Sequence, residues 1–195
     1  YNVQHMDMNG NSELAVPQNT LRAELRQLES KQWEQITLPH TPFVEPLTVL
    51  HQWQGICYYK KKITITPEEA KKHIWIEFEG AMHLADVWIN GKHVMQHAGG
   101  YTPFVVDATG LLKTGKENEL LVRLDNRNNS LIPPGKPLET LDFCYYGGIY
   151  RNVHLIAKAD VHITHPILDG HPAGAGIFIT YPKVSQELSV VDAKT

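Results

Sequence analysis

The sequence predicts an all-β protein built as an antiparallel sandwich. From Trp33 onward, short apolar runs with an alternating pattern follow one another, and turn residues rather than helices separate them. Asn90-Gly91 lies between two such runs and predicts a hairpin, because a type I′ turn needs positive φ at both central positions. Many short strands with almost no helix are typical of a sandwich or a barrel.

The first part of the chain differs from the rest. Residues 1–20 are polar and are predicted to form an irregular arm. Leu21, Leu25 and Leu28 then recur at helical spacing among charged residues, which favours a short amphipathic helix; an irregular segment before Trp33 is the alternative.

Alternation places the strands in order along the chain. In 74–79 the two isoleucines and Phe78 point to one face, while Glu77 and Glu79 point to the other, which we expect to be a solvated outer face. Thr66-Pro-Glu-Glu69, just before this run, is a capping pattern that predicts about one helical turn. Further strands are expected through Val87 and Ile89, from Val94, and at 120–125, 149–157, 161–167, 176–181 and 188–191.

The pattern divides the chain into an arm (1–32), a sandwich (33–160) and the beginning of a second β domain (161–195). The last segment has only about three expected strands, too few for an independent sandwich. We therefore expect the chain to stop inside its second domain and to be a fragment of a longer protein.

Composition excludes several classes of protein. The 195 residues are 42% hydrophobic and 20% charged, which is ordinary for a globular protein, and the net charge of −3 argues against nucleic-acid binding. No stretch approaches the roughly 20 apolar residues of a membrane span.

Cys57 and Cys144 form either one disulfide or two buried thiols. Buried thiols are the preferred interpretation, because a chain of this size needs no disulfide for stability.

No complete catalytic or metal site is predicted. The chain has eleven histidines, but His93 and His97 follow a hairpin turn rather than lying on a helix, and His162 and His165 would fall on opposite faces of a strand. No serine lies in a Gly-x-Ser-x-Gly turn.

One segment has the composition of a ligand loop. Asp142-Phe-Cys-Tyr-Tyr-Gly-Gly-Ile-Tyr-Arg-Asn-Val153 combines a carboxylate, which accepts hydrogen bonds from hydroxyls, with Tyr145, Tyr146 and Tyr150, whose rings pack against sugar C–H faces. Its glycine pair permits a sharp turn before the next strand. The alternative is an aromatic corner that plugs one end of the sandwich.

An ordered series of motifs resembles glycoside hydrolase family 2. It runs from Trp33 to Val153 and includes Leu38-Pro-His-Thr-Pro42, Gly55-Ile-Cys-Tyr-Tyr-Lys-Lys61, Phe78-Glu-Gly-Ala81, Ala85-Asp-Val-Trp-Ile-Asn-Gly-Lys92, His97-Ala-Gly-Gly-Tyr-Thr-Pro-Phe104, Asn118-Glu-Leu-Leu-Val-Arg-Leu-Asp-Asn126 and Tyr146-Gly-Gly-Ile-Tyr-Arg-Asn-Val153. The resemblance implies a jelly-roll, galactose-binding-domain-like sandwich known as the sugar-binding domain, followed by the start of an immunoglobulin-like domain.

The resemblance also implies a function. The parent would be a retaining exo-β-glycosidase whose two catalytic glutamates lie in a downstream (β/α)₈ barrel, so this chain alone is expected to be inactive. Asp142 holds the position of a family aspartate that contacts sugar hydroxyls. The loop after Leu38-Pro-His lacks the asparagine that some β-galactosidases supply, and Glu45 or Gln54 are candidate substitutes. A β-galactosidase is the first expectation; a self-sufficient carbohydrate-binding module, or a structural domain that supports a β-glucuronidase or β-mannosidase barrel, are the alternatives.

The expected partners are a terminal β-linked sugar and the downstream barrel, with no nucleic acid and no membrane span; a homo-oligomeric parent stays open. No cofactor is expected, and any metal ion of the full-length active site is not encoded in these residues. Because the chain starts at Tyr1 rather than Met, we expect a processed or trimmed start and export, to a bacterial periplasm, with the cytoplasm as the alternative.

Overall fold

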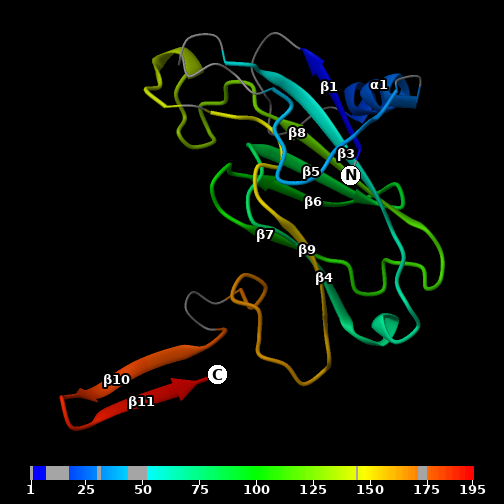
Figure 1. Cartoon of the computed structure of the whole chain (residues 1–195). Helices are drawn as coiled ribbons and strands as arrows, with labels where there is room; N and C mark the ends of the chain where they lie inside the picture. The colour runs from blue at the N-terminus through cyan, green and yellow to red at the C-terminus, as the bar shows by residue number, and fades with distance from the viewer. Residues whose placement is uncertain (1, 8–17, 30–31, 44–51, 144, 171–174) are drawn as a thin grey trace.

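The computed structural model describes residues 2–7, 18–29, 32–43, 52–143, 145–170 and 175–195. Within these residues the chain forms a sandwich of two antiparallel sheets and a separate hairpin (Figure 1). One sheet has the strand order β2-β1-β3-β8-β5-β6, and the other has the order β7-β4-β9. The strands are β1 Asn2–Asp7, β2 Glu34–Gln35, β3 Gly55–Ile63, β4 His73–Phe78, β5 Leu84–Ile89, β6 Lys92–Ala98, β7 Phe104–Asp107, β8 Asn118–Asp125, β9 Val153–Lys158, β10 Phe178–Val184 and β11 Ser189–Lys194.

The hydrophobic core lies between the two sheets. Ile74, Ile76 and Phe78 of β4 pack in one buried cluster with Val122 of β8 and Tyr59 of β3. These residues alternate along their strands with outward-facing ones, as the sequence pattern requires of a sheet with one face in the core. The predicted all-β sandwich is confirmed.

The two turn predictions are also confirmed. Asn90 and Gly91 have φ of 51° and 78° and join β5 to β6. In the predicted capping pattern, the Thr66 amide donates to Glu69 Oε2 at 2.8 Å and the Glu69 amide donates to Thr66 Oγ1 at 3.2 Å. This reciprocal capping box opens the short helix η1 (Glu69–Lys71) directly before β4.

The predicted amphipathic helix is present as α1 (Gln18–Glu29) and covers the outer face of the larger sheet. Leu28 packs against Ile56 and Tyr58 of β3, and Leu25 and Trp33 lie at the edge of the same cluster. The sandwich therefore has a third layer on this side.

Three predicted segments differ from the structure. Residues 2–7 are not an irregular arm but form β1, which pairs with β3 over its whole length. The strand expected at 149–157 begins only at Val153, because Gly148 adopts a positive φ of 95° and Ile149 is buried by packing rather than by a strand ladder. No strand forms over 161–167; instead, His162 and His165 place their rings edge-on against Trp75, at centroid distances of 5.2 and 5.4 Å.

The last two strands form the hairpin β10–β11, which lies away from the sandwich in Figure 1. The strands expected at 176–181 and 188–191 are thus present with shifted bounds, and their apolar side chains are exposed. The division into an arm, a sandwich and a second domain stays a prediction. No helix in the described part of the chain is long and apolar enough to cross a membrane.

Candidate functional site

The candidate ligand loop crosses the end of the sandwich where β3 begins and β8 ends. After the short helix η2 (Leu138–Thr140), Leu141 and Tyr145 turn inward and form a small buried cluster with Met82. Between these two anchors, Asp142 and Phe143 are exposed to solvent. The loop therefore presents Asp142 outward from a fixed base.

The carboxylate of Asp142 is available to a ligand. Among the described residues, none donates a hydrogen bond to it or forms an ion pair with it. A carboxylate that presents its acceptor sites to solvent can receive hydrogen bonds from the vicinal hydroxyls of a sugar. This is the chemistry that the sequence predicts for Asp142, and its contact with a sugar stays a prediction.

The structure places Tyr145 in a buried position, and not on the solvent-facing side of the loop. Its side chain is only 4% exposed, and its hydroxyl is hydrogen-bonded to Nδ1 of His83, which is itself buried. Burial lowers the pKa of His83 to about 4 and raises the pKa of Tyr145 above its ordinary value, so both groups are neutral near pH 7. Tyr145 braces the loop from below; its predicted contact with a sugar is untested.

Of the other two tyrosines of the loop, Tyr150 belongs to an aromatic corner, whereas Tyr146 stays a candidate for sugar contact. Tyr150 donates its hydroxyl to the carbonyl of Gly100, and Arg151 donates to the carbonyls of Glu79 and Tyr101 at 3.4 and 3.3 Å. This part of the loop is an aromatic corner that closes the sandwich. Tyr146 is half-buried and remains a candidate for sugar contact.

The glycine pair is required by close packing. A Cβ on Gly148, which has φ of 95°, would lie 2.5 Å from Tyr59 Oη and 2.8 Å from the carbonyl oxygen of His40. A Cβ on Gly147 would lie 2.8 Å from Nδ2 of Asn126. Only glycine allows the loop to approach the sandwich this closely.

Gln54, a predicted substitute for the missing asparagine, is engaged within the protein. Its Nε2 donates to Asn128 Oδ1 at 3.3 Å, and its Oε1 accepts from the Asn128 amide at 3.2 Å. Its role as a sugar contact stays a prediction.

Glu45, the other predicted substitute, and Cys144 lie outside the described residues. Cys57 is a buried free thiol, and burial raises its pKa.

Sequence reasoning missed three residues that shape this site: Gln52, His83 and Asn126. Asn126 Oδ1 accepts from the Gly55 amide at 2.8 Å, and its Nδ2 donates to the carbonyl of Trp53 at 2.9 Å. The Asn126 side chain thus replaces a peptide group and extends the pairing of β3 with β8 past the strand end. An asparagine directly after a strand is the signal that could have indicated this role.

The space beneath the loop is small. His83, Asn126, Ile132 and Tyr145 are among the residues that line a cavity of about 10 Å³, room for about one water molecule. Among the described residues, this space beneath the loop is therefore too small to hold a sugar.

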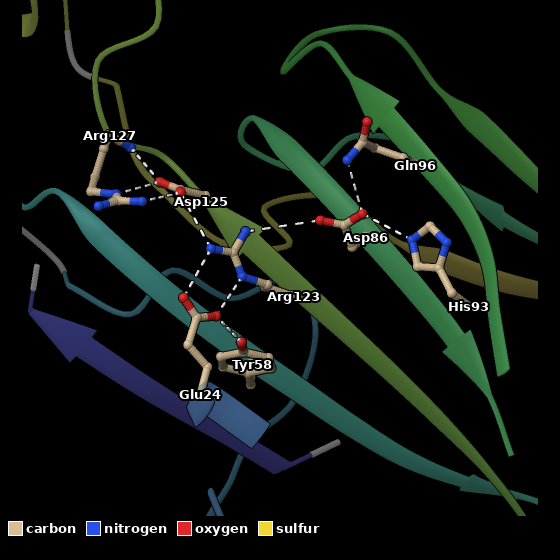
Figure 2. A network of polar contacts seen from close by, with 8 residues as sticks. All are labelled: Glu24, Tyr58, Asp86, His93, Gln96, Arg123, Asp125 and Arg127. Carbon is tan, nitrogen blue, oxygen red and sulfur yellow. Dashed lines mark hydrogen bonds and ion pairs between the residues drawn. The ribbon is translucent and has the colours of Figure 1, made fainter. Parts of the chain in front are cut away.

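A network of charged side chains joins α1 to β5 and β8 of the larger sheet (Figure 2). Arg123 Nε donates to Glu24 Oε2 at 2.8 Å, and its Nη atoms lie 3.5 Å from Asp125 and 3.9 Å from Asp86. Burial disfavours the charged form of Arg123, but the hydrogen bonds and charge of Glu24 outweigh it and raise the pKa of Arg123. These buried carboxylates are held by Arg123, and Asp125 is also bonded to Arg127 at 2.7 Å, so we interpret them as a structural network and not a catalytic pair.

Two glutamates outside this network pair with histidines. Glu79 contacts His154 at 3.1 Å, and Glu77 lies 3.6 Å from His165, so the outer face predicted for these glutamates carries two histidine partners. The His154 hydrogen bond lowers the pKa of Glu79. In the described part of the chain, no group of three or more histidine, cysteine or acidic side chains is arranged to hold a metal ion.

Comparison with known proteins identifies the family. The sequence model described as glycosyl hydrolases family 2, sugar binding domain, matches residues 5–159. A β-glucuronidase from Bacteroides fragilis is 34% identical over 165 residues, which cover 82% of this chain and 22% of the relative, and a β-galactosidase from Thermoanaerobacter pseudethanolicus is 34% identical over 153 residues, which cover 77% and 20%.

Solved structures agree with this assignment. Bacteroides uniformis β-glucuronidase 2, covalently bound to cyclophellitol-6-carboxylate aziridine, superimposes with a TM-score of 0.69 at 33% identity over 83% of this chain and 18% of that one. A putative β-galactosidase from Bacteroides fragilis gives a TM-score of 0.67 at 29% identity over 95% of this chain and 27% of that one. The chain spans about a fifth of the length of the curated relatives it matches. It belongs to glycosyl hydrolase family 2, as the sugar-binding domain of that family.

Proposed function

We propose that this chain is the N-terminal sugar-binding region of a retaining exo-β-glycosidase, in which Asp142 forms part of the sugar site. The observation that carries the proposal is the exposed Asp142 carboxylate, which the described residues leave without a partner, on a loop fixed by the buried side chains of Leu141 and Tyr145. In this arrangement the domain contributes one wall, and the rest of the site comes from the longer parent protein.

The catalytic carboxylates are proposed to lie outside this chain. A retaining glycosidase needs two carboxyl groups about 5–5.5 Å apart and open to the substrate. Several described carboxylates are engaged with a cation or a histidine: Arg123 holds Glu24, His154 contacts Glu79, and Lys62 pairs with Glu117. Asn118-Glu119, which resembles a catalytic Asn-Glu pair in sequence, is structural: Asn118 closes the turn before β8 through bonds of 2.7 and 3.0 Å to the backbone of Lys113.

The first proposed substrate is a terminal β-galactoside, and the second is a β-glucuronide. The segment from Asp125-Asn126 to Ile132-Pro-Pro-Gly135 resembles the β-galactosidase branch. Support for a glucuronide comes from relatives with that name, which are as similar to this chain as the relative named β-galactosidase. Both substrates have ring hydroxyls that can donate hydrogen bonds to the Asp142 carboxylate.

The test is a substrate panel on the full-length enzyme that contains this domain. Nitrophenyl β-galactoside, β-glucuronide and β-mannoside are compared by kcat/KM. We expect hydrolysis of the galactoside to dominate. Dominance of the glucuronide would select the second substrate, and the absence of hydrolysis of all three would contradict the proposed function.

A further inference from the structure

Gln52 connects the beginning of β3 to the loop that carries Asp142. Its Nε2 donates to the carbonyl of Phe143 at 3.1 Å, and its Oε1 accepts from the amide of Tyr145. One side-chain amide therefore bonds to the backbone on both sides of residue 144, and the first of its partners is the neighbour of Asp142.

The base of this connection is held by hydrogen bonds to the larger sheet. The residues after Gln52 are bonded to the end of β8, since Asn126 bonds to the carbonyl of Trp53 and the amide of Gly55, and the Asn126 amide donates to the Gly55 carbonyl at 3.2 Å. Gln52 thus transmits the position of the sheet to a loop segment whose own side chains at 142 and 143 are exposed.

Further bonds fix the ends of the loop but not its tip. The Met82 amide donates to the carbonyl of Gly148 at 2.9 Å, and the hydroxyl of Tyr145 bonds to His83. Among the described residues, Gln52 supplies the side-chain hydrogen bond that reaches Phe143, directly beside Asp142. Displacing a binding group by about 1 Å can reduce catalysis by up to about 100-fold.

We propose that Gln52 is a positioning residue for the sugar site, which holds Asp142 in the geometry that receives the sugar hydroxyls. This inference rests on the proposed function of Asp142. Gln52 itself does not contact the reacting atoms; it acts through the backbone of the loop.

Gln54 provides a matched comparison within the same segment. It is also a glutamine that uses both ends of its amide, but its partner is Asn128 in the loop after β8 and not the segment beside Asp142. A substitution at Gln54 removes a similar pair of hydrogen bonds without touching the link to Phe143.

The test is a double-mutant cycle in the full-length enzyme, measured as kcat/KM with the substrate that the panel selects. Gln52→Leu is expected to lower kcat/KM by about 10- to 100-fold when Asp142 is present and by less than about twofold in an Asp142→Ala background. Gln54→Leu is expected to change kcat/KM by the same factor in both backgrounds.

Two results distinguish a failure of the proposed function of Asp142 from a failure of the inference about Gln52. If Asp142→Ala alone leaves kcat/KM unchanged, the proposed function is overturned and this inference with it. If Asp142→Ala lowers kcat/KM but Gln52→Leu then acts equally in both backgrounds, Gln52 has only a structural role and this inference alone is overturned.

A second variant keeps the test informative if Gln52→Leu does not fold. Gln52→Glu retains the acceptor for the Tyr145 amide but, when ionised, cannot donate to the Phe143 carbonyl. The ratio of its kcat/KM to that of the wild type should rise as the pH falls toward the ordinary range of a glutamic acid, about 4–5, where the carboxyl becomes a donor. A ratio that stays flat across this range contradicts the proposed hydrogen bond to Phe143.

Discussion

Glu24 on α1 and Arg123 on β8 form a buried, two-pronged ion pair across 99 residues of sequence. Arg123 Nε and Nη2 donate to the two carboxylate oxygens of Glu24 at 2.8 and 3.3 Å, and the hydroxyl of Tyr58 donates to the same carboxylate (Figure 2). The pair fixes the helix to the outer face of the larger sheet beside the apolar contact of Leu28.

Removing the charge of Glu24 should therefore destabilise the fold. Glu24→Gln leaves Arg123 buried without its main anion, and breaking a buried ion pair from one side costs about 3 kcal/mol or more. Urea denaturation of this chain measures the loss. The matched control is Glu117→Gln, which breaks the exposed Lys62–Glu117 pair of 2.7 Å and should leave the free energy of unfolding unchanged within error. Equal stability of the two variants would contradict the role given to Glu24.

The buried His83 predicts a loss of stability in acid. Because burial lowers its pKa from 6.5 to about 4, the unfolded chain binds a proton between these values that the folded chain does not. Stability from this group is complete above pH 6.5 and falls as the pH decreases toward 4, by about 3 kcal/mol over the whole window. The measurement is the difference in unfolding free energy between the wild type and His83→Gln, which does not titrate. From pH 7 to pH 4.5 the wild type should lose stability relative to His83→Gln. A difference that does not change with pH would show that His83 does not titrate as described.

Substituting two glycines with positive φ distinguishes the stability cost of backbone strain from the cost of steric overlap. Gly110→Ala meets no atom within 4 Å, so its cost should be the strain of φ at 72°, about 1–2 kcal/mol. Gly148→Ala has the same kind of strain at φ of 95° and also places Cβ 2.5 Å from Tyr59 Oη. It should cost clearly more, about 3 kcal/mol or above, because the loop must move away from the sandwich. Similar unfolding free energies for the two variants would mean that the loop does not pack on Tyr59 and His40 as described.

Local patterns predicted the elements that depend on local chemistry. The alternation in 74–78, the Asn90-Gly91 turn, the capping box at Thr66 and the leucine spacing of α1 are each set by residues within a few positions of one another, and all are present. The sandwich follows from the same signals.

The features that were missed depend on partners distant in sequence. β1 is short and has no clear alternating pattern, and its pairing with β3 and β2 makes it a strand. The segment 161–167 is not a strand because its histidines pack on Trp75, more than 80 positions earlier. The same holds for the site: the aspartate was predicted from its motif, but the links from Gln52 and His83 to the loop join residues about 60 to 90 positions apart and leave no local pattern.

The chain by itself is expected to be inactive as a glycosidase. It should hydrolyse nitrophenyl β-galactoside, β-glucuronide and β-mannoside only at background rates, because the two carboxyl groups that a retaining glycosidase needs are proposed to lie outside this chain. Calorimetry with galactose, mannose and glucuronate should give millimolar affinity or none, since a single wall buries little ligand surface. Hydrolysis that survives repurification and is lost in Asp142→Ala would contradict this expectation.

The most direct test of the central claim is to measure kcat/KM and the melting temperature on one purified Asp142→Ala variant of the full-length enzyme. Charge-assisted hydrogen bonds to sugar hydroxyls contribute about 1.5–3 kcal/mol each, and each 1.36 kcal/mol is a factor of ten in rate. The account predicts a kcat/KM lower by about 10- to 1,000-fold with an unchanged melting temperature, because the exposed carboxylate faces the ligand and not the core. A lower melting temperature with near-normal kinetics would contradict it and would assign Asp142 to the support of the aromatic corner.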